Sequence, residues 1–109
     1  MAYNQALAQR VKKLLSDKPG YTEKKMFGGL GFLLHGNMAC GILNDDLIVR
    51  VGLEKYEGLL KLSGARVFDI TGRPMKGWIM VAPAGHDSEE KLAAWVERGA
   101  DFALSLPPK

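Results

Sequence analysis

The stretch GFLLHGNMACGILNDDLIVRV, residues Gly31 to Val51, decides the fold class. It contains three apolar runs, GFLLH, MACGIL and LIVRV, which are separated only by the turn-forming residues Gly36-Asn37 and Asn44-Asp45-Asp46. Connections this short predict consecutive antiparallel strands, because a parallel pair needs a long crossover between its strands. The stretch therefore predicts the centre of an antiparallel meander.

The first turn also predicts a register. If Gly36-Asn37 forms the turn, His35 pairs with Met38 and Leu33 pairs with Cys40. His35 and Cys40 then lie diagonally on one face, roughly 7–8 Å apart. This spacing argues against a direct Cys–His contact, and a zinc site would need a third convergent ligand. Cys40 is expected to be a small buried hydrophobe.

The flanking sequence predicts the other elements from apolar periodicity and from Pro and Gly stops. We expect an opening helix that stops near Lys18-Pro19-Gly20, a strand over Thr22–Met26, the three strands above over Gly31–His35, Met38–Leu43 and Leu47–Val51, a helix over Glu54–Leu62, strands over Ala65–Asp69 and Gly77–Val81, and a closing helix that begins at Asp87 and Glu90 and ends at Pro107-Pro108. This α-ββββ-α-ββ-α order predicts an α+β fold, with helices packed on an antiparallel sheet of about six strands.

Composition indicates an ordinary soluble protein. The 109 residues are 47% hydrophobic and 25% charged, and we expect one domain spanning residues 1–109. The formal net charge of +3 permits an acidic partner or nucleic acid without requiring one. Cys40 is the only cysteine, which excludes an internal disulfide and fits a reducing cytoplasm. No apolar run approaches the ~18 residues of a membrane helix, so we expect a cytoplasmic protein without a membrane partner.

The segment KMFGGLGF, Lys25 to Phe32, raises the question of a phosphate loop. The third glycine of a dinucleotide fingerprint would fall on Leu34, and the lysine and hydroxyl of a P-loop would fall on Asn37 and Met38. Both motifs also need a following helix, whereas a strand is expected here. We therefore interpret the segment as a structural bend of the sheet, with no cofactor. The bend comprises Phe27, Gly28, Gly29 and Gly31.

A second segment, TGRPMKGW, is more suggestive of binding. Arg73 and Lys76 are expected on an exposed loop beside Trp78, and such a group can hold an anion or the carboxylate of a partner. The alternative is a solvated loop with the tryptophan packed into the sheet. Lys24 and Lys25 are further candidates for contact with a partner. No constellation of catalytic or metal-binding residues stands out, because the serines and paired carboxylates fit helix ends and turns.

The sequence resembles the N-terminal domain of the TfoX/Sxy family. The resemblance rests on KMFGGLGFLLHGNMACGIL, DLIVRV, ARVFD, RPMKGWIMV and a closing helix with Trp95-Val96, and covers nearly the whole chain. Its most specific part is Met26-Phe27-Gly28-Gly29. The resemblance implies a secretion-chaperone-like α+β fold and a role as a non-enzymatic coactivator of competence genes, acting with the cyclic-AMP receptor protein. Regulatory members carry a second, C-terminal helical domain that these 109 residues lack, so we expect a shared fold and binding surface before a shared competence role.

Three functions follow as hypotheses. The first is a non-enzymatic module that binds another protein, such as a component of the transcription machinery. The second is direct nucleic-acid binding through Lys24, Lys25, Arg73 and Lys76, with strong salt dependence. The third is a small enzyme or ligand-binding protein that uses the glycine bend as a pocket wall. Unpaired edges of the sheet could also join two chains into a homodimer.

Overall fold

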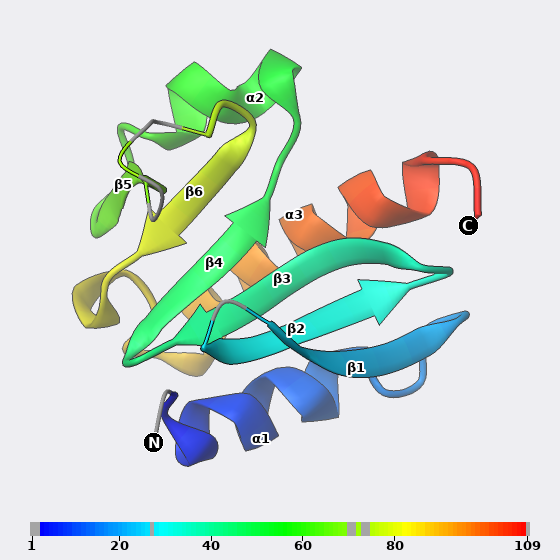
Figure 1. Ribbon diagram of the computed structural model, residues 1–109. Helices are drawn as coiled ribbons and strands as arrows, with labels where there is room; N and C mark the ends of the chain where they lie inside the picture. Colours follow the sequence, from blue (N-terminus) through cyan, green and yellow to red (C-terminus); the bar gives the residue numbers. More distant parts are fainter. Residues whose placement is uncertain (1–2, 27, 70–71, 73–74, 109) are drawn as a thin grey trace.

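The computed structural model describes residues 3–26, 28–69, 72 and 75–108, which form one sheet with helices around it (Figure 1). The elements are α1 (Gln5–Leu15), β1 (Tyr21–Met26), β2 (Gly29–Leu34), β3 (Asn37–Leu43), β4 (Asp46–Arg50), α2 (Leu53–Leu59), β5 (Ala65–Val67), β6 (Trp78–Val81), a short 3-10 helix η1 (Pro83–Gly85) and α3 (Glu89–Ser105).

The sheet has six strands in the order β1-β2-β3-β4-β6-β5, and every neighbouring pair is antiparallel. The predicted α+β class, the strand number and the α-ββββ-α-ββ-α order are therefore confirmed. The first four strands form the predicted meander. β6 then returns beside β4, so that β5 becomes one edge of the sheet and β1 the other.

The predicted turn between β2 and β3 is wrong by one residue. The two turn residues are His35 and Gly36, with φ of +53° and +82°, and Leu34 pairs with Asn37. A two-residue hairpin turn of type I′ needs positive φ at both central positions, which glycine adopts without strain. Asn37 instead lies in β3, where its side-chain amide donates a hydrogen bond of 3.0 Å to the carbonyl of Pro107.

The register of this hairpin changes accordingly. Phe32 pairs with Cys40 and Leu33 pairs with Met38, so Ala39 is an extra residue at a register shift. Both pairings expected from the sequence, His35 with Met38 and Leu33 with Cys40, are therefore wrong. His35 lies in an exposed turn, whereas the Cys40 side chain is fully buried.

The connection between β1 and β2 is shorter than predicted. β2 begins at Gly29, which pairs with Met26, and Gly31 pairs with Lys24. Gly28 has φ of +77° between the two strands, and Phe27 lies outside the described residues. Gly29 and Gly31 are thus strand residues, buried within the sheet.

The start of the closing helix is also corrected. Ser88 is the N-cap of α3, because its hydroxyl accepts a hydrogen bond of 3.2 Å from the amide of Lys91. The predicted start at Asp87 and Glu90 is therefore displaced by one residue. Asp87 lies before the cap and forms an ion pair of 3.1 Å with the Lys91 ammonium group.

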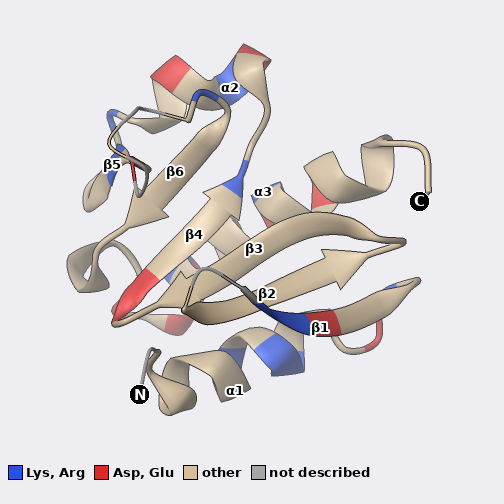
Figure 2. Ribbon diagram, in the orientation of Figure 1, with Lys and Arg blue, Asp and Glu red and all other residues tan. Residues whose placement is uncertain are grey.

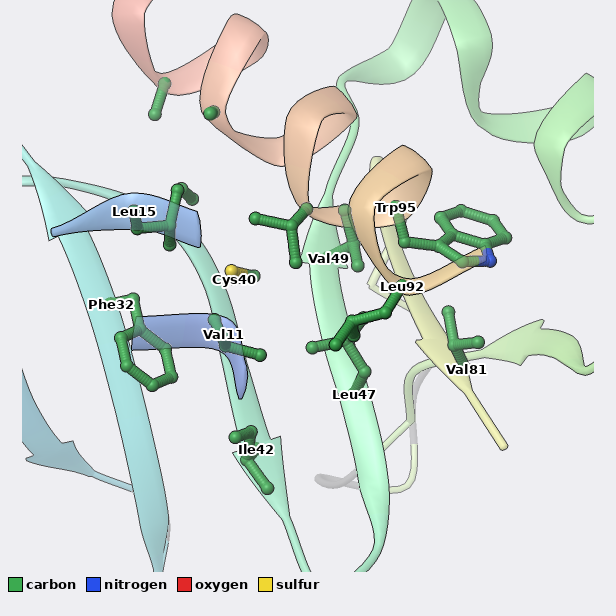
Figure 3. Close-up of a cluster of buried hydrophobic side chains, with 14 of the residues drawn as sticks. Val11, Leu15, Phe32, Cys40, Ile42, Leu47, Val49, Val81, Leu92 and Trp95 are labelled. Atoms are coloured by element: carbon green, nitrogen blue, oxygen red, sulfur yellow. The ribbon is translucent and has the colours of Figure 1, made fainter. Parts of the chain in front are cut away.

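The core lies between one face of the sheet and the helices α1 and α3. Figure 3 shows Val11 and Leu15 of α1 beside Phe32 and Cys40, and Leu92 of α3 beside Leu47. Strands β2, β4 and β6 contribute alternate side chains to this layer, whereas β3 contributes Ala39, Cys40 and Ile42 across its register shift. In the part of the chain that the structure describes, no helix combines the length and hydropathy needed to cross a membrane.

Candidate functional site

An arginine at the end of β4 contacts two aromatic rings. Arg50 is the last residue of β4 and pairs with Trp78, the first residue of β6. Its guanidinium carbon lies 5.3 Å from the centroid of the Trp78 ring and 5.2 Å from that of Phe102, on α3. Both distances are typical of cation–π contacts. We call Arg50, Trp78 and Phe102 the arginine–aromatic cluster.

The backbone after β4 positions this cluster. The amides of Val51 and Gly52 both donate to the carbonyl of Gly77, over 2.8 and 3.1 Å, which ties the end of β4 to the start of β6. Gly52 has φ of +83°, and a Cβ atom there would lie 2.5 Å from Cε1 of Phe102. Only glycine therefore allows the chain to turn into α2 while the Phe102 ring stays against it.

The donors of the Arg50 guanidinium have no acceptor among the described residues. Its contacts there are the two rings, and no carboxylate of that part of the chain lies within ion-pair distance of it. By contrast, Arg66 lies 2.7 Å from Asp46 and Arg10 lies 2.8 Å from Glu89. A guanidinium has five N–H donors in one plane, which fit the paired oxygens of a carboxylate or phosphate. The half-buried Arg50 is therefore suited to bind an anion through its edge.

A cavity adjoins the cluster at Phe102. Its volume is about 600 Å³, and it lies between the start of α2 and the second half of α3. Phe102 belongs to both the cavity lining and the cluster. The lining includes Leu53, whose side chain is 72% exposed, and the charged residues Glu54, Lys55, Arg98 and Asp101. The site thus combines apolar surface with an anion-binding edge.

The predicted binding residues fall into two separate places. Trp78 belongs to the cluster, and the exposed Lys76 precedes it by two residues. Lys24 and Lys25 lie on β1, at the edge of the sheet, with β2, β3 and β4 between them and β6. Four strand spacings amount to about 19 Å, so the structure does not bring these lysines to Trp78. Arg73 lies outside the described residues.

The described basic residues are spread over several elements. Figure 2 shows Lys and Arg on α1, β1, α2 and the end of β4, with Asp and Glu on the same elements or beside them. The two lysines of β1 also point to opposite faces, because side chains alternate along a strand. A continuous basic track for a nucleic-acid backbone is therefore not formed by the described elements of this view.

The sequence did not suggest Arg50 or Phe102 as binding residues. LIVRV indicates a strand, and the only local signal is an arginine within an otherwise apolar run. Nothing in the pattern places Phe102, 52 positions later, against this arginine. The contact depends on how α3 crosses the sheet.

Other reactive side chains lie apart from the cluster. Burial raises the pKa of the Cys40 thiol far above its ordinary value, so the thiol stays protonated and is a poor nucleophile. The buried His86 donates from Nε2 to the carbonyl of Asp45 over 2.9 Å. Across the described ranges, no group of three or more His, Cys, Asp and Glu side chains converges to hold a metal ion.

A second cavity, of about 230 Å³, lies between α1 and β1. Gln9, Lys12 and Glu23 are polar residues of its lining, and Leu30 and Phe32 are apolar ones. Ligand pockets usually enclose about 300–1,000 Å³. The larger cavity beside the arginine–aromatic cluster is therefore the better binding site of the two.

Comparison with known proteins identifies the family. The family model described as the TfoX N-terminal domain matches residues 13–103 of the 109-residue chain. The matched range contains the whole sheet and all three residues of the arginine–aromatic cluster. The comparisons with curated proteins and with solved structures gave no match. The chain belongs to the TfoX N-terminal domain family.

Proposed function

We propose that the chain is a non-enzymatic protein-interaction module of the cytoplasm that takes part in transcription regulation, such as that of competence genes. Family membership supports the regulatory role. The observation that carries the binding role is Arg50, a half-buried guanidinium between two rings whose donors find no acceptor in the described chain. Arginine and tryptophan are also the side chains most enriched at the centres of protein interfaces.

The aromatic rings of the cluster favour a protein partner over a nucleic acid. A single strand is bound by stacking its bases on free aromatic faces. The Trp78 ring already contacts the Arg50 guanidinium, and the Phe68 ring lies 6.2 Å away at an interplanar angle of 45°. Phe102 likewise contacts Arg50 and the backbone of Gly52. Little aromatic surface is therefore left for bases.

Affinity capture from a nuclease-treated lysate of the source cell tests this proposal. We expect the wild-type chain to retain a protein partner, and Arg50→Ala to lose roughly 90% of it, because a charge-assisted contact at an interface centre is removed. Lys61→Ala is the matched control, since Lys61 is exposed, lies outside the cavity lining and has no ion pair with the described residues. This control should capture as much partner as the wild type.

Two results would contradict the proposal. One is capture from an untreated lysate that is lost after nuclease treatment. This result would mean that a shared nucleic acid links the chain to the captured proteins. The other is equal capture by the wild type and by a folded Arg50→Ala variant, which would place the interaction elsewhere on the surface.

A further inference from the structure

We propose that the partner presents an acidic–apolar peptide segment, in which a carboxylate side chain binds the edge of Arg50 and a neighbouring large apolar side chain enters the cavity beside Leu53. This inference rests on the proposed function and names the chemistry of its partner. It combines the anion-binding edge and the cavity, which share Phe102.

The carboxylate follows from the geometry of Arg50. The two rings contact the guanidinium, and its N–H donors find no acceptor in the described chain, so these donors remain for a ligand. These donors bind a carboxylate in a bidentate manner. Partial burial strengthens such a contact, since fewer water molecules compete for the donors. The rings also restrict the arginine rotamers, which lowers the entropy lost when a ligand binds.

The apolar side chain follows from the cavity beside α2. Leu53 is 72% exposed, more than any other large hydrophobic residue that the structure describes, and it lies at the first position of α2. Phe102 provides a second apolar wall. A volume of about 600 Å³ is ample for a Leu or Phe side chain. Such a side chain would remove the exposed surface of Leu53 from water, which favours binding.

The two contacts are close enough for two nearby residues of one segment. Phe102 lines the cavity, whereas Arg50 does not. The guanidinium carbon of Arg50 lies 5.2 Å from the centroid of the Phe102 ring. An extended chain advances about 3.3 Å per residue and turns successive side chains to opposite sides. A carboxylate two positions from the apolar residue lies on the same side of the segment, about 7 Å away, and therefore spans the ring.

Charge at the cavity favours a peptide over a phosphate chain. Glu54 and Asp101 line it and make no ion pair with the described residues. Their charges balance those of Lys55 and Arg98, so the cavity itself has no excess of positive charge. A run of phosphates would be repelled by the two carboxylates. A single carboxylate at Arg50, with an uncharged side chain in the cavity, avoids this repulsion.

Titration of the full chain with three synthetic peptides tests the inference. The probe is acetyl-Gly-Ser-Glu-Ser-Leu-Phe-Ser-Glu-Gly-Ser-amide, which has one carboxylate two positions from each end of an apolar pair and so allows either chain direction. One control has Gln in place of Glu, and the other has Ala in place of Leu and Phe. Fluorescence anisotropy gives the affinity, and the Trp78 indole N–H resonance reports the location.

We expect the acidic–apolar peptide to bind and to shift the Trp78 resonance, with each control at least roughly 10-fold weaker. Arg50→Ala should weaken binding by roughly 10-fold or more. Leu53→Ala should weaken it by roughly 3-fold or more, and its exposure means that the fold tolerates the change. Lys61→Ala should bind like the wild type.

Equal affinity for the neutral peptide would overturn the inference, as would binding that ignores both Arg50→Ala and Leu53→Ala. If an oligothymidine shifts the Trp78 resonance and the peptide does not, the site binds nucleic acid and the inference is wrong. If protein capture depends on Arg50 while the probe peptide leaves Trp78 unshifted, the proposed function stands and this inference fails. If the peptide binds but capture is independent of Arg50, the inference about the site stands and the proposed cellular role fails.

Discussion

Replacing Gly99 with alanine is expected to lower the free energy of unfolding by about 3 kcal/mol. A Cβ atom on Gly99 would lie 2.3 Å from the carbonyl oxygen of Ala39 and 3.1 Å from its carbonyl carbon. Both atoms are backbone of β3, at the register shift of the hairpin, and cannot move aside as a flexible side chain can. α3 would therefore have to move away from the sheet and loosen the core between them.

The expected loss of stability in Gly99→Ala is opposite in sign to the gain expected from helix propensity alone. Alanine is favoured over glycine in a helix by up to about 1 kcal/mol. Gly58 of α2 is the matched control, since a Cβ atom there meets nothing within 4 Å. Chemical denaturation should show a gain of up to about 1 kcal/mol for Gly58→Ala. A Gly99→Ala variant as stable as the wild type would contradict the described contact between α3 and β3.

Leu92→Ala is expected to cost about 3 kcal/mol of unfolding free energy. Leu92 is fully buried and extends from α3 toward Leu47, near Val81 (Figure 3). Removing its side chain leaves a cavity that the close-packed sheet and helix cannot fill. Urea denaturation monitored by tryptophan fluorescence gives the value from the shift in midpoint at an unchanged slope.

Leu104→Ala on the same helix is the control for this prediction. Leu104 is 38% exposed and lies outside the core, so its truncation should change stability by less than about 1 kcal/mol. Similar losses for the two variants would mean that α3 does not present Leu92 to the sheet as described.

The fold was predictable because its signals are local. Apolar runs divided by two-residue turns specify antiparallel neighbours, and the same runs, read in order, gave the α+β class. The errors are shifts of one to three residues at the ends of elements. β2 begins at Gly29 and not at Gly31, and α2 ends at Leu59 and not at Leu62. Whether His35 or Asn37 enters the turn depends on positive φ, and Asn37 is also held in β3 by the distant carbonyl of Pro107. The N-cap at Ser88 is decided by a single hydroxyl contact.

The candidate site was only partly predictable, for a different physical reason. Trp78 and Lys76 are near each other in the chain, so a local pattern suggested them. Arg50 meets Trp78 because β6 inserts beside β4 in the sheet, and it meets Phe102 because α3 packs against β4. Lys24 and Trp78 are placed far apart by the same strand order. Long-range contacts of this kind are absent from the sequence pattern of any one element.

We propose that a protein partner covers the surface of the arginine–aromatic cluster and its cavity. Site-specific photocrosslinking in the source cell tests it most directly, with p-benzoylphenylalanine in place of Leu53. The matched control carries the same group in place of Lys24, which is exposed on β1 at the opposite part of the sheet. We predict a discrete protein adduct from position 53 that disappears when Arg50→Ala is added, and none from position 24. An adduct from position 24 with none from position 53 would place the partner on β1 and not on the arginine–aromatic cluster.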